Sequence, residues 1–261
     1  MKYWRTFLLS LSTQMQYRAN LILWLVEGAI GPFTMILVWF TIMGSRSELG
    51  GYAKGDFIVY YLFVTVGFYI VGGSFSRPIG RAIRNGEINK NFLQPYSVVF
   101  GAFAREQAWK LVSLVITLPP LLVIAYFLRV YLSWGMVVGE WWQIGTSLFL
   151  GTILFAMIEA IIGLLAFWVT EIWPFAEMYE MLLYFFGGTM APLTLLPISV
   201  QRVSAYLPFR YIFYEPIAIA LGKESGPTQA LGLQALFIVI MYAIYRLIWS
   251  RGIKKYEAIG G

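Results

Sequence analysis

Six apolar stretches dominate this chain, and they are long enough, or nearly so, to cross a lipid bilayer as helices. A membrane-spanning helix needs about 20 predominantly apolar residues. The stretches cover residues 20–43, 57–76, 111–129, 142–167, 175–190 and 229–250. Only 12% of the 261 residues are charged, whereas an ordinary soluble domain carries about 25%. The sequence therefore predicts an all-α integral membrane protein with six transmembrane helices in one domain, residues 1–261, and a soluble enzyme is close to excluded.

The distribution of basic residues predicts the orientation of these helices. Thirteen of the 19 Lys and Arg residues lie in residues 1–19, 77–110 and 246–261. In a six-span topology these three segments face the same side, and cytoplasmic loops are the ones enriched in Lys and Arg. Both termini are therefore predicted to be cytoplasmic. The net charge of +6 is explained by anionic lipid headgroups, so no nucleic-acid partner is expected.

The N-terminal segment, residues 1–19, is too polar to be a span. Its apolar residues recur at helical spacing, with Lys2 and Arg5 on other faces, which is typical of an interfacial amphipathic helix over residues 3–18. A secretory signal peptide is the alternative. Ser10, Ser12 and Thr13 interrupt the apolar run and no small-residue cleavage site follows, which argues against it.

Two connecting segments carry further patterns. The loop 77–110 keeps apolar residues within a charged stretch, which fits a short amphipathic helix ended by Pro95, although a solvated connector fits as well. The segment 191–228 is apolar, but its prolines prevent one continuous helix. It predicts a re-entrant pair of short helices between spans five and six, or else an outer loop with an interfacial helix. The residues singled out in this outer segment are Pro192, Pro197, Pro208 and Arg210.

Two carboxylates fall inside predicted spans. Glu27 lies in span one and Glu159 in span four, both roughly 10–12 Å from the inner membrane boundary at 1.5 Å per helical residue. Because charge within a bilayer is costly, such residues are functional candidates for a substrate path or a contact between subunits. Alternatively, each is a hydrogen-bonded carboxyl that locks helix packing, or is shallow enough to reach headgroup water.

Several kinds of chemistry are excluded by what the chain lacks. It has no His and no Cys, and Asp56 is its only Asp, so no metal site or hydrolytic centre is expected. It also contains no phosphate-binding G-x-x-x-x-G-K-[ST] loop. The sequence predicts that the chain is not an enzyme and holds no cofactor.

The order of three features resembles the type-2 ABC-transporter permease family, the membrane half of many bacterial exporters. The first is the amphipathic helix before span one. The second is the loop with Gly86-Glu87-Ile88 and Phe92-Leu93-Gln94-Pro95-Tyr96-Ser97. The third is the proline series after span five. The resemblance covers essentially the whole chain.

This resemblance implies a division of labour. Two copies of a separate cytoplasmic ATPase would bind ATP and Mg, and a second permease half, the same chain or another, would complete the substrate path in the bacterial cytoplasmic membrane. A coupling helix around residues 84–93 would sit in a groove of the ATPase, with Ile88 and Phe92 in the buried contact and Glu87 and Lys90 in rim ion pairs. The predicted ATPase-coupling residues are Arg84, Glu87, Ile88, Lys90, Phe92 and Leu93. The substrate would be an amphiphile: a lipid, glycolipid, peptide or drug.

Two other classes of protein stay open. A secondary transporter usually shows inverted repeats with broken helices in matching positions. Pro119–Pro120 and the proline-rich stretch 191–216 do not correspond in this way. A membrane scaffold or assembly factor is not excluded, but it would leave the coupling-type loop without a purpose.

Overall fold

The computed structural model describes residues 18–88, 98–132, 140–224 and 226–256, and most of these are helical. The helices are α2 (Arg18–Met43), α3 (Lys54–Ile70), α4 (Ser76–Arg84), α6 (Val98–Phe127), α7 (Trp141–Leu164), α8 (Trp173–Phe186), α9 (Ile198–Ala205), α10 (Tyr214–Ala220) and α11 (Pro227–Lys255). Strands β1 (Glu48–Leu49) and β2 (Tyr52–Ala53) form a small hairpin between α2 and α3. Short 3₁₀ helices are η1 (Arg129–Tyr131), η2 (Leu165–Phe167), η3 (Leu193–Leu195) and η4 (Pro208–Tyr211). The amphipathic helix predicted over residues 3–18 lies almost wholly outside the described residues.

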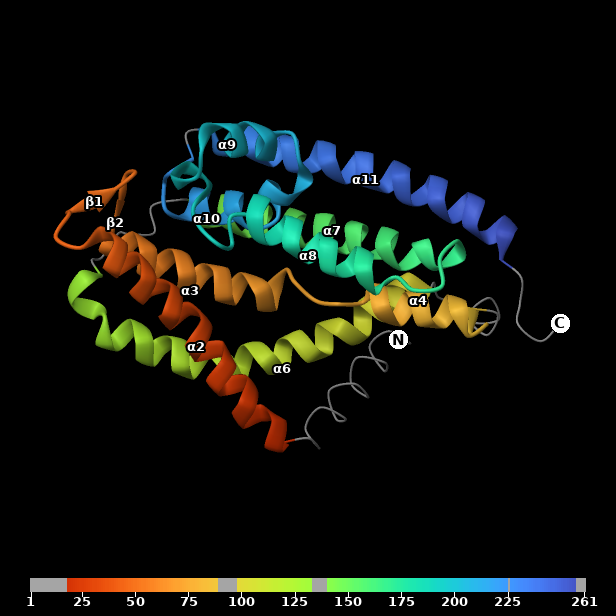
Figure 1. Cartoon of the computed structure of the whole chain (residues 1–261), viewed down its shortest axis with the longest axis horizontal. Helices are drawn as coiled ribbons and strands as arrows, with labels where there is room; N and C mark the ends of the chain where they lie inside the picture. The colour runs from red at the N-terminus through yellow and green to blue at the C-terminus, as the bar shows by residue number, and fades with distance from the viewer. Residues whose placement is uncertain (1–17, 89–97, 133–139, 225, 257–261) are drawn as a thin grey trace.

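The long helices run alternately between two ends of the molecule (Figure 1). The hairpin end carries β1, β2, α9 and α10, and the α4 end carries α4, the turn after α7 and the last turns of α11. Helix α7 packs along α11, while α2, α3 and α6 contact one another as a second group. Helices α4 and α10 connect the groups, because α4 contacts both α6 and α7 and α10 contacts both α3 and α7.

Three helical segments are long and apolar enough to cross a membrane: Val99–Phe127, Trp141–Phe167 and Pro227–Lys255. Residues Gly28–Met43 form a shorter apolar helix. These segments overlap the predicted spans three, four, six and one. The fold is therefore that of a helical membrane protein, while six crossings remain a prediction.

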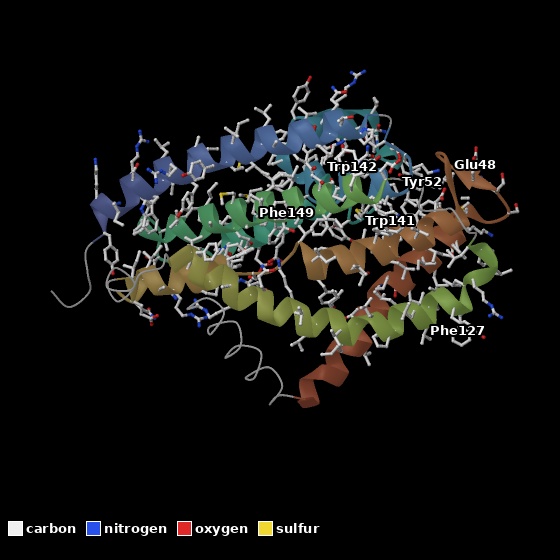
Figure 2. The ribbon with its side chains drawn as sticks, turned by 180° about the vertical axis from the view of Figure 1, so that it is seen from behind. Glu48, Tyr52, Phe127, Trp141, Trp142 and Phe149 are labelled. Carbon is white, nitrogen blue, oxygen red and sulfur yellow. The ribbon has the colours of Figure 1, made fainter. Side chains whose placement is uncertain are left out.

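The surface of these helices suits lipid rather than water. Leu122, Phe149 and Val239, on three different helices, are 65–66% exposed. Figure 2 shows Phe149 along α7 and Trp141 and Trp142 at its start, at the hairpin end. Tryptophans at helix ends beside apolar surface are typical of a membrane–water interface.

Two predicted spans correspond to helices shorter than a bilayer. Span two (57–76) overlaps α3, which has 17 residues, and span five (175–190) overlaps α8, which has 14. At 1.5 Å per residue α8 is about 21 Å long, against a hydrocarbon core of about 30 Å. Any crossing at these positions needs the non-helical residues that follow each helix.

The loop predicted over 77–110 is shorter than expected. Helix α4 occupies its start, and α6 already begins at Val98, so residues 98–110 belong to a helix that the sequence placed at 111–129. The charged residues that suggested a loop are tolerated because Lys110 binds a backbone carbonyl at the end of α3 and Glu106 binds a backbone N–H between α3 and α4. Helix α6 also continues through Pro119–Pro120, and Figure 1 shows its axis bent, as proline pairs predict.

The outer segment 191–228 is built of short elements, and three of them, η3, α9 and η4, are started by a proline. Pro192 precedes η3, Pro197 precedes α9, and Pro208 is the first residue of η4, where the missing N–H costs no helical bond. This segment contains two short helices, α9 and α10, and their re-entry into the membrane stays a prediction. All seven residues of α10 are buried.

Candidate functional site

The break between α3 and α4 is the most polar feature inside the helical body. Residues 71–75 leave the helix, and Gly73 has a φ of 142°, a conformation that other residues rarely adopt. Lys110 of α6 is 3% exposed, and its Nζ donates hydrogen bonds to the carbonyls of Ile70 at 3.2 Å and Val71 at 3.0 Å. A cation therefore satisfies the negative end of α3.

Carboxylates satisfy the positive end of α4. Oε2 of Glu159, from α7, accepts the backbone N–H groups of Phe75 at 3.0 Å and Ser76 at 2.9 Å. Oε1 of Glu106 accepts the N–H of Ser74 at 3.3 Å. Because the first N–H groups of a helix have no partner within it, Glu159 acts as a tertiary cap for α4.

The structure thus realises the packing alternative that the sequence left open for Glu159. This carboxylate is 2% exposed and fixes one helix to another. For Glu27, the structure places the backbone in α2, while its side chain lies outside what is described.

Helix α4 is docked on α7 by packing and at both ends by ion pairs. Gly163 of α7 admits α4, because a Cβ there would lie 2.8 Å from the Cβ of Ile79. Arg77 Nη2 lies 2.6 Å from Glu177 Oε1, and Arg84 pairs with Glu171 in the turn that follows α7. These contacts attach α4 to both α7 and α8.

Only part of the predicted ATPase contact is described. Arg84 ends α4 and Glu87 is exposed shortly after it, whereas Lys90, Phe92 and Leu93 lie outside the described residues. Ile88 is 1% exposed and belongs to the chain's own hydrophobic core. In this structure it offers no surface to a partner and instead anchors the segment.

Two cavities lie beside the last turns of α3, where Phe68 lines both. The first, called the apolar cavity, has a volume of about 450 Å³ and lies between α2, α3, α6 and α8. The second, called the acidic cavity, has about 340 Å³, and its wall includes Gly73, Glu159 and Glu180. Both are lined by Phe68, Tyr184 and Thr189, so they adjoin along one side. Their volumes are in the range of small-molecule sites.

Two tyrosines of α3 fix the wall that the cavities share. Tyr60 donates a hydrogen bond to the carbonyl of Gly188 at 2.5 Å, and Tyr61 donates one to that of Met190 at 2.7 Å. The Tyr61 hydroxyl also accepts the indole N–H of Trp39 at 2.5 Å. These bonds hold the chain after α8 in place beside Thr189.

A second charged cluster lies at the hairpin end. Arg210 Nε lies 2.5 Å from Glu215 Oε1, and its Nη2 lies 3.6 Å from Glu224 Oε2. Glu215 is 2% exposed, and this burial raises the pKa of its carboxyl to about 7 in spite of the Arg210 guanidinium. Lys223 pairs with Asp56 at 3.0 Å, which ties the chain after α10 to the start of α3. Arg210, which the sequence singled out, therefore belongs to a group of ion pairs that hold the outer segment in place.

Comparison with known protein families gives a match over nearly the whole chain. The family model described as an ABC-2 family transporter protein matches residues 29–260. The match includes the helix break, the outer segment and every described lining residue of the two cavities except Gly28. No curated protein matches the chain.

Proposed function

The chain belongs to the ABC-2 family of transporter proteins, as a membrane permease subunit, and we propose that it serves an ATP-driven exporter of amphiphilic molecules in the bacterial cytoplasmic membrane. Two copies of a separate ATPase would bind ATP and Mg, since proteins of this family generally work with ATPase subunits. A second permease half, either another copy or a related chain, would complete the substrate path.

One observation carries this proposal. Glu159 lies in the wall of the acidic cavity and also holds the first N–H groups of α4. A displacement of α4 therefore moves a residue of the cavity wall directly. Such a link is what a permease needs in order to turn work done on a cytoplasmic segment into a change of its substrate path.

The α4 end would face the cytoplasm. The basic residues of α4 and of the last turns of α11 gather there, in keeping with the positive-inside rule. The six predicted spans would then leave both termini on the cytoplasmic side and the hairpin end outside.

The segment after α4 would contact the ATPase. Arg84 and Glu87 would lie at the edge of that contact, and Lys90, Phe92 and Leu93 would supply its centre. Ile88 would keep the base of the segment attached to the permease core. When the ATPases close around ATP, they would then pull on α4 by way of the residues that Ile88 attaches to the core.

Copurification tests the assignment. The tagged chain is expressed with the ATPase encoded beside it, as wild type and as Phe92→Asp. The control is Tyr206→Asp, which makes the same kind of change at an 84% exposed position directly after α9, the helix that Figure 1 shows at the hairpin end. ATP hydrolysis is measured in proteoliposomes.

We expect wild type and Tyr206→Asp to retain the ATPase and its hydrolysis, and Phe92→Asp to lose both. If Phe92→Asp retains the ATPase as well as wild type does, the coupling segment is wrongly assigned. If wild type retains no ATPase, the proposed coupling fails, and uptake driven by a proton or sodium gradient would then test the secondary-transporter alternative.

A further inference from the structure

We propose that the two adjoining cavities bind an organic cation with an apolar body, such as a quaternary onium compound, with its positive group at Glu180 and Glu159. This narrows the substrate class of the proposed function and rests on it only for the claim that the bound molecule is transported.

The acidic cavity has the charge that such a ligand needs. Glu159 and Glu180 are the charged residues of its lining, and no basic side chain lines it in the part of the chain that is described. Arg77 pairs with both Glu177 and Glu180, its Nη2 lying 2.6 Å from Glu177 Oε1 and 3.8 Å from Glu180 Oε1, so it compensates the charge of Glu180 only in part. The Lys110 ammonium group donates its hydrogen bonds to the carbonyls at the end of α3. A cation entering this space would therefore meet two carboxylates and no basic side chain in the described lining.

The same cavity is lined by aromatic rings. Phe68, Phe155 and Tyr184 come from three different helices and surround the space that the two carboxylates border. Aromatic faces attract cations that cannot donate hydrogen bonds, and quaternary ammonium groups are recognised in this way. Carboxylates and rings together suit a bulky, weakly hydrated cation better than a metal ion, which would require several oxygen ligands.

The adjoining apolar cavity would take the body of the ligand. No charged residue occurs among its described lining residues. Gly31 faces open space there, since nothing lies within 4 Å of a Cβ built on it. Ser113, which is 1% exposed, also lines this cavity, and its hydroxyl has no hydrogen-bond partner in the described structure. A buried hydroxyl without a partner points to a group that is supplied by something bound.

Binding of tetraphenylphosphonium tests the charge preference, because tetraphenylborate has nearly the same shape and the opposite charge. Binding of each radiolabelled ion is measured separately on the full chain in nanodiscs, with empty nanodiscs subtracted. The variants are Glu180→Gln, whose side chain is 54% exposed and binds no backbone group in the described structure, and Gly31→Leu, which fills the apolar cavity. The controls are Glu140→Gln, an exposed carboxylate outside both cavities whose side chain makes no capping bond, and Gly145→Leu, another glycine with open space around it.

We expect the phosphonium ion to bind and the borate ion not to. Glu180→Gln should weaken phosphonium binding by about tenfold, Gly31→Leu should abolish it, and the two controls should leave it unchanged. Equal binding of the two ions, or no effect of Glu180→Gln, would overturn the inference even if the ATPase copurifies and hydrolyses ATP. Phosphonium binding with the expected variant pattern, but without coupling to an ATPase, would uphold the site and refute ATP-driven transport.

Discussion

Replacing Glu159 with glutamine should loosen α4 while leaving the rest of the fold intact. The carboxylate accepts two backbone hydrogen bonds, of 3.0 and 2.9 Å, from the first turn of α4. A neutral hydrogen bond contributes about 1 kcal/mol, and one to a charged group about twice as much. The amide oxygen of glutamine can still accept both bonds, so the variant should lose about 1 kcal/mol for each, or about 2 kcal/mol in total.

Hydrogen exchange measures this loss directly. A cost of about 2 kcal/mol in local opening corresponds to an increase of about 30-fold in the exchange rate of the Phe75 and Ser76 amides. The assay follows peptides covering residues 74–84 by mass spectrometry of the purified protein in nanodiscs. Peptides from α11 should be unaffected, because α11 does not contact Glu159 through any described hydrogen bond.

The matched control is Glu140→Gln. Glu140 is the exposed N-cap residue of α7, and its side chain makes no capping bond. It should leave the exchange of every described helix unchanged. Unaltered protection of Phe75 and Ser76 in Glu159→Gln would refute the capping role and, with it, the link between α4 and the cavity wall.

Three further predictions follow from other contacts. Tyr61→Phe removes a hydroxyl that joins Trp39 to the carbonyl of Met190, and thermal unfolding in detergent should show a loss of about 1–3 kcal/mol. Gly163→Ala places a Cβ 2.8 Å from that of Ile79, so α4 should detach more often and trypsin should cleave within it faster, whereas Gly145→Ala should have no such effect. The raised pKa of Glu215, about 7 against an ordinary 4.5, means that the folded chain holds a proton that the unfolded chain releases. Stability should therefore fall as pH rises from 4.5 through 7, by at most about 3 kcal/mol, and melting temperatures of Glu215→Gln should lack this component.

Apolar length predicts where the long helices lie, but not where they end. The predicted span 229–250 lies within α11, which extends from Pro227 to Lys255. Hydropathy marks the part of a helix that can sit in lipid, whereas the backbone stays helical until its own bonding ends. Charged residues such as Lys254 and Lys255 lengthen α11 without being visible to a hydropathy window.

Charge misled the prediction for residues 77–110 for a related reason. Glu106 and Lys110 counted as surface residues because charged side chains are normally solvated. They are spaced by four residues, so on α6 they project from one face, and that face meets the break between α3 and α4. The helical spacing and the Gly72-Gly73 pair were readable in the sequence, but their meeting in space was not.

The case of Glu159 shows why a site of this kind is only half predictable. The cost of a carboxylate inside a span is readable from the sequence and singles the residue out. Its partners are backbone N–H groups, which every residue except proline carries, and the nearer of the two is 83 positions away in the chain. No residue type signals such a partner.

The same geometry sets a condition on any account of coupling in this permease. If Glu159 borders the acidic cavity and caps α4, then occupancy of the cavity and the docking of α4 share one group. A ligand that draws the carboxylate toward itself weakens the cap. By thermodynamic reciprocity, a partner that displaces α4 must change the affinity of the cavity by the same factor. Coupling between the cavity and the α4 end therefore requires no long chain of intermediates, because a single side chain belongs to both.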